Sequence, residues 1–243
     1  MKNLPFQQAT ENLLKQIRQT GSEPNQTSLS SHSSLSRVTI FDGKTEDEQL
    51  HIFGKVAARW CNNRYHIDES NYHAIKVVIN YITREKPMSD GVKGLMLFGD
   101  RGTGKTVIMK TMNALMPDED KFTFVNVPQL AGYYSQKGDE IFDKFNRTTD
   151  GNWVMNQASK LNHICLNDIG REKPESMWMG NKEDVGSMLI YLRYDLFQDR
   201  RVITHATSNF QNMDECAERY GDLNADRMRE MFYWIELKGQ SRR

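Results

Sequence analysis

Eight consecutive residues have the types and spacing that bind a phosphate chain. They match the pattern G-x-x-x-x-G-K-[ST] at every specified position: Gly99, Asp100, Arg101, Gly102, Thr103, Gly104, Lys105 and Thr106. The glycines let successive backbone N–H groups point at a phosphate, and Lys105 adds a full positive charge near the β and γ phosphates. The Thr106 hydroxyl is placed to bind Mg²⁺. The motif predicts binding of ATP with Mg²⁺, without by itself predicting hydrolysis.

A polar pair follows a second apolar run and is the best candidate to serve the metal and the attacking water. In many ATPases with this loop the pair is two acids, but here it is Asn167 and Asp168. An amide offers no charge to a hard cation. Two interpretations stay open. Either Asp168 is the base and Asn167 a weakened metal partner, or Asp168 binds Mg²⁺ together with Thr106 while Glu172 or no residue serves the water. Both predict slow hydrolysis.

A third apolar run ends in Thr207, Ser208 and Asn209. Alone, this tripeptide is a turn signal. In ATPases whose sheet contains an additional strand, a polar residue at such a strand end touches the γ-phosphate or the attacking water. Asn209 follows Asp168 by one helix and one strand. For this reason Asn209 is predicted to be catalytic, together with Lys105 and Asp168.

Apolar runs alternate with helical patterns from residue 68 onward, as the positioning of these groups requires. Strands are predicted at 94–98, 122–127, 163–167, 201–207 and 233–237. Helices are predicted at 68–84, 105–116 and 184–198, with others between 128 and 161 and two short ones before the last strand. This alternation predicts an α/β fold, a parallel sheet with helices on both faces in three αβα layers.

The chain is predicted to begin with a short helical appendage. Residues 1–18 carry apolar side chains at helical spacing, and 19–37 are Ser-rich like a flexible linker. Residues 38–243 would form the ATPase domain. A single amphipathic helix cannot bury its apolar stripe alone, so it either docks on the domain or waits for a partner. A disordered terminus without a role is the alternative.

Composition excludes several classes of protein. The 243 residues contain 32 Lys and Arg and 32 Asp and Glu, so the formal net charge is zero. A globally basic nucleic-acid binder is excluded, although a local basic face is not. The mean hydropathy of −0.70 and the absence of a long apolar run exclude a membrane protein. With three cysteines, no CxxC spacing and no apolar signal core, we expect a cytoplasmic protein.

Four segments together resemble the AAA+ ATPases of the DnaC/IstB type, which include bacterial helicase loaders and transposition helper ATPases. The segments are GDRGTGKT, ICLNDIG, LRYDLFQDRRVITHATSN and DRMREMFYWIELKGQSRR. The resemblance runs from about Gly94 to the C-terminus, and its specificity lies in the order and spacing of the four segments. It implies a P-loop NTPase fold with an additional strand, and assemblies of copies that share the nucleotide between subunits.

The resemblance also implies roles for two arginines. Arg227 matches the segment of the arginine finger, which reaches the γ-phosphate held by the next subunit, and Arg229 is the second choice. Arg242 matches the second sensor and would contact the nucleotide. Asn167 departs from the family pattern, which has an acid there.

Loading of a replicative helicase is the first functional hypothesis, with DNA, a helicase and further copies of the chain as partners. A transposition helper that marks target DNA beside a transposase is the close alternative. A switch or scaffold that binds ATP and barely hydrolyses it is the third, and a small-molecule kinase is a weaker fourth.

One segment mixes aromatic and basic residues in a way that suits single-stranded DNA. It contains Tyr133, Tyr134, Lys137, Phe142, Lys144, Phe145 and Arg147. The simpler interpretation, favoured at zero net charge, places the aromatic side chains in the core and the charges on a solvated face.

Overall fold

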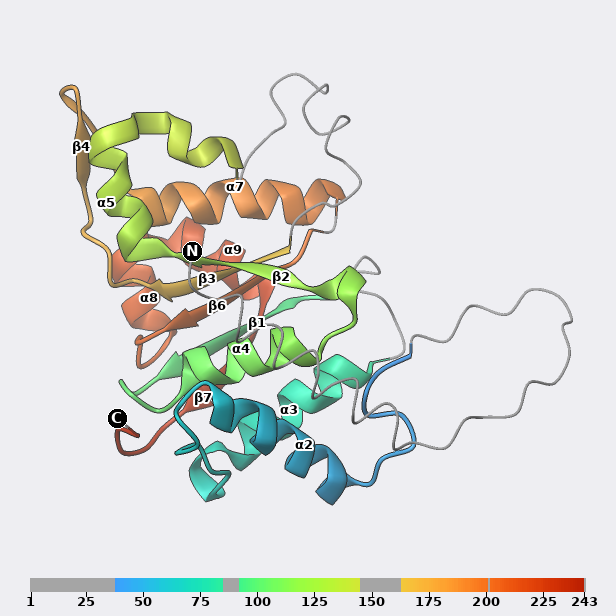
Figure 1. Ribbon diagram of the computed structural model, residues 1–243. Coiled ribbons are helices and arrows are strands. Elements are labelled where there is room, and N and C mark those ends of the chain that lie inside the picture. Colours follow the sequence, from blue (N-terminus) through green and yellow to red (C-terminus); the bar gives the residue numbers. More distant parts are fainter. Residues whose placement is uncertain (1–37, 85–91, 145–162, 201, 243) are drawn as a thin grey trace, which may run out of the picture.

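A five-stranded parallel sheet forms the centre of the molecule (Figure 1). The computed structural model describes residues 38–84, 92–144, 163–200 and 202–242, so the predicted helix 1–18 and linker 19–37 lie outside the described residues. The strands are β1 (Gly94–Gly99), β2 (Phe122–Asn126), β3 (His163–Ile169), β6 (Thr204–Ser208) and β7 (Phe232–Leu237). Their order is β2-β3-β6-β1-β7, with every neighbouring pair parallel. Because β6 separates the loop strand β1 from the acid strand β3, the expected additional strand is confirmed.

Helices cover both faces of this sheet (Figure 1). On one face lie α2 (Glu46–Arg59), α3 (Glu69–Thr83) and α4 (Lys105–Leu115). On the other lie α5 (Val127–Lys137), α7 (Val185–Arg200), α8 (Met213–Tyr220) and α9 (Asp222–Met231). Two 3₁₀ turns, η1 (Asp118–Asp120) and η2 (Gly138–Lys144), complete these layers. The predicted α/β fold with three αβα layers is confirmed, and no helix in the described ranges is long and apolar enough to cross a bilayer.

Helix α2 is absent from the elements expected from the sequence, although it has a strong start signal. Thr45 and Glu48 form a capping box, in which the side chain of each residue pairs with the backbone N–H of the other. The helix buries Ile52, Phe53 and Val56 against the core. Together with α3, it supplies one wall of the site described below.

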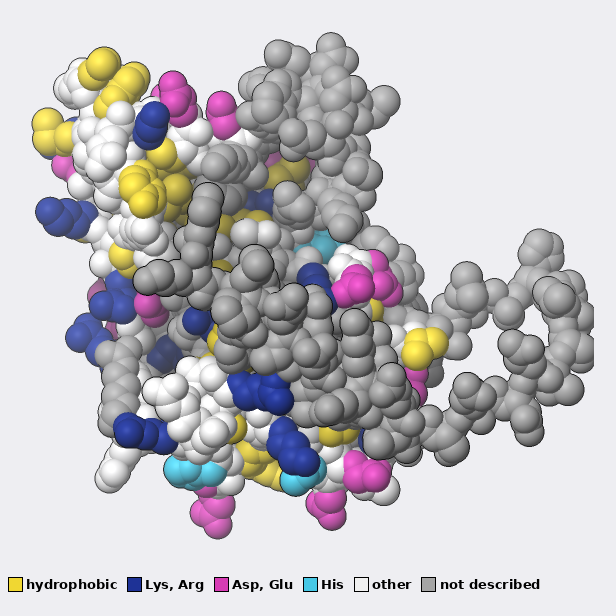
Figure 2. Space-filling model, in the orientation of Figure 1, with side chains coloured by type: hydrophobic (Ala, Val, Ile, Leu, Met, Phe, Trp, Pro, Cys, Tyr) yellow, Lys and Arg dark blue, Asp and Glu magenta, His cyan; other side chains and the backbone are white. Residues whose placement is uncertain are grey.

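A short hairpin between β3 and α7 is a second unexpected element. It consists of β4 (Ser176–Trp178) and β5 (Asn181–Glu183), joined through Met179 and Gly180 with φ of 49° and 87°. Such positive φ values are typical of tight hairpin turns. Met177 and Met179 are exposed, and hydrophobic side chains gather at the end of the molecule where β4 and α5 lie (Figure 2).

The aromatic and basic segment is divided between core and surface. Tyr134 and Phe142 are buried and pack on each other with ring centroids 6.2 Å apart, which confirms the core interpretation for these two side chains. Tyr133 is exposed. Phe145 and Arg147 lie outside the described residues, as does the side chain of Lys144.

Two histidines of the sheet, His163 in β3 and His205 in β6, are expected to make the stability of the fold depend on pH. His205 is completely buried, and its Nδ1 accepts the Leu95 N–H at 3.0 Å. Its Nε2 has no hydrogen-bond partner among the described residues. Burial holds the pKa of His205 well below its usual value, and burial also lowers the pKa of His163.

We therefore expect the free energy of unfolding to fall as the pH drops below about 6.5, the ordinary histidine pKa. In that range the histidines of the unfolded chain bind protons, whereas the buried histidines of the folded chain stay neutral. For His205 alone the free energy of unfolding should fall by about 1.4 kcal/mol per pH unit there. Urea unfolding between pH 7.5 and 5.5 measures this slope, and His205→Gln should reduce it. An equal slope in the variant would contradict the assignment.

Candidate functional site

The loop between β1 and α4 has the backbone geometry of a phosphate cradle. Gly99, Gly102 and Gly104 have φ of 112°, 81° and 98°, in the region that favours glycine. Gly104 is also the N-cap of α4 and makes no side-chain capping bond. No side chain of the cap therefore competes with a ligand for the first-turn N–H groups, and the helix dipole favours an anion there. The loop therefore fits a nucleotide phosphate chain.

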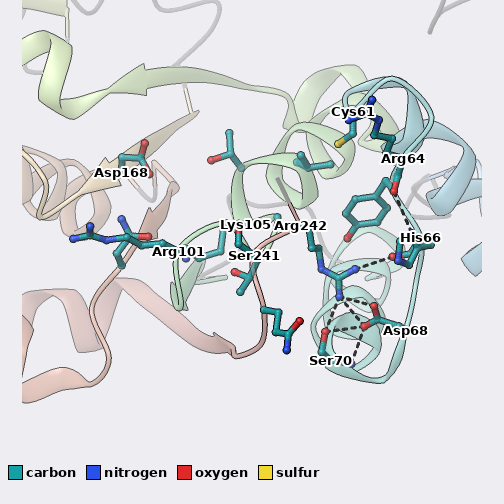
Figure 3. A pocket seen from close by; sticks show the side chains of 18 of the residues that line it. Cys61, Arg64, His66, Asp68, Ser70, Arg101, Lys105, Asp168, Ser241 and Arg242 are labelled. Carbon is teal, nitrogen blue, oxygen red and sulfur yellow. Dashed lines mark hydrogen bonds and ion pairs between the residues drawn. The ribbon is translucent and has the colours of Figure 1, made fainter.

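A cavity of about 770 Å³ opens on this loop, a size that suits a nucleotide (Figure 3). Asp168 and Arg101 lie toward one end in Figure 3, and Cys61, Arg64 and His66 lie toward the other. The cavity thus spans the distance between the strand ends and the connection from α2 to α3. Of the predicted site residues, those from Arg101 to Thr106, Asp168, Asn209 and Arg242 all line it.

Lys105 lies at the floor of the loop and is only 6% exposed. Its Nζ donates to the carbonyl oxygens of Gly99 at 2.8 Å and Asp100 at 2.5 Å. The Asp100 carboxylate in turn accepts the Gly239 N–H at 3.1 Å. The ammonium group is thus held within the loop that would surround the phosphates.

Asn167, rather than Asp168, lies against the predicted metal residue Thr106. Asn167 Oδ1 accepts the Thr106 hydroxyl at 2.9 Å and the Thr207 hydroxyl at 3.1 Å, and the residue is only 8% exposed. The described residues contain no group of three or more His, Cys, Asp or Glu that could hold a metal. The geometry favours the interpretation in which Asn167 is the weakened metal partner.

Asp168 is turned into the cavity by an irregularity in the sheet. The register of β3 against β6 shifts between Leu166 and Ile169, and Asp168 has a φ of 60°. Bulges of this kind re-aim side chains beside active sites. The Asp168 backbone N–H donates to the Thr207 hydroxyl at 2.9 Å, and its carboxylate pairs with Arg171 at 3.1 Å.

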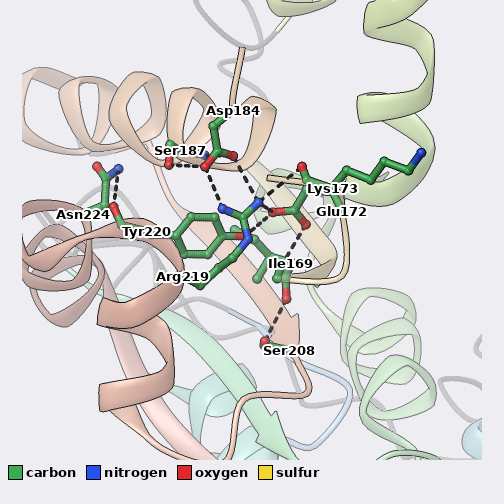
Figure 4. Close-up of polar contacts among 10 residues, drawn as sticks. Ile169, Glu172, Lys173, Asp184, Ser187, Ser208, Arg219, Tyr220 and Asn224 are labelled. Atoms are coloured by element: carbon green, nitrogen blue, oxygen red, sulfur yellow. Dashed lines mark hydrogen bonds and ion pairs between the residues drawn. The ribbon is translucent and has the colours of Figure 1, made fainter. Parts of the chain in front are cut away.

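Glu172 is absent from the residues that line the cavity. Figure 4 shows it pointing toward Arg219 and Tyr220. Its side chain is completely buried, where it accepts bonds from the Tyr220 hydroxyl, from Arg219 at 3.0 Å and from the Gly170 N–H at 2.9 Å. Arg219 also pairs with Asp184 at 2.6 Å. The interpretation that assigned the attacking water to Glu172 is therefore corrected, because this carboxylate instead anchors the turn after β3.

The C-terminal segment crosses the phosphate loop and places Arg242 in the cavity. The Arg242 backbone N–H donates to the Gly102 carbonyl at 3.0 Å. A Cβ atom at Gly102 would lie 2.2 Å from Ser241 Oγ, so a side chain there would displace this segment. The guanidinium donates to both Asp68 oxygens at 2.7 Å and to Ser70 Oγ at 2.6 Å. The hydrogen bond from Arg242, and after it those from Ser70, hold the pKa of Asp68 well below its usual value.

Arg227 lies outside the cavity, on the surface formed by α7 and α9. Its guanidinium carbon is 4.9 Å and 5.4 Å from the ring centroids of Tyr191 and Tyr194, and Nη1 donates to Asn224 at 3.0 Å. Arg229 is exposed and pairs with Asp226 at 3.5 Å. Neither arginine reaches the cavity of its own chain, so action on a neighbouring subunit stays a prediction.

The connection from α2 to α3 supplies cavity residues that the sequence did not reveal. Tyr65 lies closest to the phosphate loop among them, since a Cβ atom at Gly104 would be 3.4 Å from its ring. Burial raises the pKa of the Tyr65 hydroxyl. Cys61, Arg64 and His66 line the cavity beside it. No motif marks this stretch, because its residues come together only through the packing of α2 and α3.

No protein-family model matches the chain, and no curated protein matches it. Solved structures do. The DnaC helicase loader has a TM-score of 0.54 and 19% identity over 74% of this chain and 99% of its own. A candidate primosome component from Streptococcus pyogenes serotype M3 has a TM-score of 0.51 and 18% identity over 72% of this chain and 84% of its own. DnaI is similar at a TM-score of 0.47 and 24% identity, over 72% and 86% of the two chains. The fold expected from the resemblance, that of the DnaC-type P-loop ATPases, is confirmed.

Proposed function

We propose that this chain is an AAA+ ATPase that binds ATP with Mg²⁺ in the cytoplasm and acts in DNA replication as a helicase loader. The observation that carries the proposal is the cradle. The left-handed Gly102 and Gly104, the uncapped start of α4, Lys105 and Thr106 all line one cavity, and Asn167 accepts the Thr106 hydroxyl at its edge. A nucleoside triphosphate supplies the anion that this arrangement fits and the bond that hydrolysis breaks.

In this site Lys105 would bind the β and γ phosphates, and Thr106 and Asn167 would hold the metal. Asp168 would accept the proton of the attacking water, and Asn209 at the end of β6 would orient that water or the γ-phosphate. Arg242, fixed by Asp68, would complete the wall over the loop.

Assembly and partners form the second part of the proposal. Because Arg227 lies on an outer surface, a shared site would need a second copy of the chain. The DnaC helicase loader matches this fold over 99% of its own chain, and its name supports a helicase as a partner. DNA is proposed as a partner because a helicase loader would act where the helicase meets DNA. Residues 1–18 would then dock the helicase, and residues 38–243 would form the ATPase domain.

One observation favours a slower, switch-like protein as the second candidate. The amide of Asn167 occupies the position beside Thr106 where a carboxylate would bind the metal more strongly. A protein that binds ATP and rarely hydrolyses it could mark a replication complex without consuming the nucleotide quickly.

Steady-state hydrolysis of ATP, with and without single-stranded DNA, tests the proposal. We expect slow turnover that DNA stimulates, and we expect Asn167→Asp to raise the rate about tenfold at limiting Mg²⁺, because one added charge strengthens metal binding. Thr207→Val, which removes the hydroxyl bonds to Asn167 and to the Asp168 N–H without adding charge, disturbs the same pair and should not raise the rate. Tight ATP binding without turnover in either protein would favour the switch, and no ATP binding would refute both candidates.

A further inference from the structure

We infer that Arg171 is a cation of the triphosphate site that acts within its own subunit: it pairs with Asp168 in this structure and moves to the terminal phosphate when ATP binds. This inference rests on the proposed function and adds a residue to it. Arg171 would thereby distinguish ATP from ADP.

Arg171 lies between two cavities that meet at the phosphate loop. It lines the cavity of about 770 Å³ together with Lys105, Thr106 and Asp168. It also lines a neighbouring cavity of about 400 Å³, which shares Arg101 and Asn209 with the first. The guanidinium therefore has open space on both sides, at the end of the site where Asp168 and Asn209 lie.

Within the described part of the chain, Arg171 is the side chain that forms an ion pair with the Asp168 carboxylate, with Nη1 to Oδ2 at 3.1 Å. Arg171 is 49% exposed and Asp168 is 23% exposed. An ion pair with this much solvent contributes little, so a triphosphate can displace it. A carboxylate that must accept a proton from water needs its partner removed, and the γ-phosphate offers a guanidinium more charge and a matching fork of oxygens.

The backbone that carries Arg171 is held firmly. The Arg171 N–H donates to the Asp168 carbonyl at 3.3 Å, and the preceding Gly170 N–H donates to the buried Glu172 carboxylate at 2.9 Å. Arg219 and Tyr220 fix Glu172 in turn. A rigid turn with a mobile, solvent-exposed side chain is suited to exchanging one anionic partner for another.

The other cations of the large cavity are differently placed. The Lys105 ammonium lies on loop carbonyls, the Arg242 guanidinium lies on Asp68, and Arg64 lies at the end of the cavity away from Asp168 (Figure 3). Arg101 belongs to the loop itself, and in the described part of the chain Asp168 forms its ion pair with Arg171 and not with Arg101. Arg171 is thus the cation that couples the predicted base to the end of the triphosphate.

Calorimetric titration of the full chain with ATP and with ADP, both with Mg²⁺, tests this inference. Arg171→Ala should weaken ATP binding about tenfold, the effect of one lost charge-assisted hydrogen bond, and should change ADP binding less than about twofold. Arg171→Lys keeps the charge and should recover part of the loss. Lys173→Ala removes an exposed cation two residues away and should change neither affinity.

Equal loss of ATP and ADP affinity in Arg171→Ala, or no loss, would overturn the inference while leaving the proposed function intact. An effect of Lys173→Ala as large as that of Arg171→Ala would also overturn it, because general surface charge would then explain the result. If the unmodified chain bound neither nucleotide, the proposed function itself would fail.

Discussion

Replacing Lys105 with alanine should abolish ATP binding at concentrations that saturate the unmodified chain. We expect the affinity to fall at least about a hundredfold, since a buried charge-assisted contact to phosphate is lost. The Lys105 side chain places a positive charge at the floor of the loop, where the carbonyl oxygens of Gly99 and Asp100 orient its ammonium group. Titration with ATP and Mg²⁺ measures the loss.

The control for this prediction lies on the same helix. Lys110 stacks over the Trp60 ring at 5.3 Å and does not line the cavity, so Lys110→Ala should bind ATP normally. Because Lys105 is buried, circular dichroism and thermal unfolding must show that Lys105→Ala remains folded. A folded Lys105→Ala protein with unchanged ATP affinity would refute the assignment of the loop.

Replacing Arg227 with alanine should leave ATP binding within about threefold and lower turnover about a thousandfold, the range of an arginine finger. The arginine lies outside the cavity of its own chain, where Tyr191 and Tyr194 hold it at the surface. A guanidinium supplied by the neighbouring subunit would act on the transition state and not on binding. Rates and affinities measured on the same preparation separate these effects.

Mixing two inactive variants tests whether the site is shared. Arg227→Ala lacks the arginine but keeps Asp168, and Asp168→Asn lacks the base but keeps the arginine. Their mixture should recover part of the activity, because some interfaces then combine both intact groups. Arg229→Ala, the variant of the second candidate for the finger, loses an exposed pair with Asp226 and should remain active if Arg227 is the finger; an inactive Arg229→Ala protein would favour Arg229 instead. No recovery in the mixture would place the complete site within one chain.

Much of the fold could be predicted because its signals are local. The apolar run from Leu95 to Leu97 is buried on both faces, as parallel strands are, and Asp68 caps α3 as its type suggests. Helix α2 has an equally local capping signal at Thr45 and Glu48, so it too lay within reach of the sequence. The hairpin β4–β5 is harder to predict, since its strands have three residues each and expose much of their surface.

The candidate site also has a part that local sequence predicts and a part that it does not. The phosphate loop could be identified from the sequence alone, because its eight residues are adjacent and their own backbone forms the phosphate-binding turn. The roles of Asn167 and Asp168 could not be separated, because a shift of register against β6 decides which of the two faces Thr106. Side chains alternate along a strand, so only the paired sheet settles that choice.

A P-loop, a polar strand end and an alternating α/β pattern can be recognised in the amino-acid sequence without any coordinates. Which distant residues meet them depends on the folded chain: the bond of Arg242 to Asp68 joins positions 174 residues apart. The difference arises from the range over which each interaction acts. Backbone conformation and hydrophobic periodicity act over a few residues, whereas a cavity wall is built by elements that pack together irrespective of their distance along the chain.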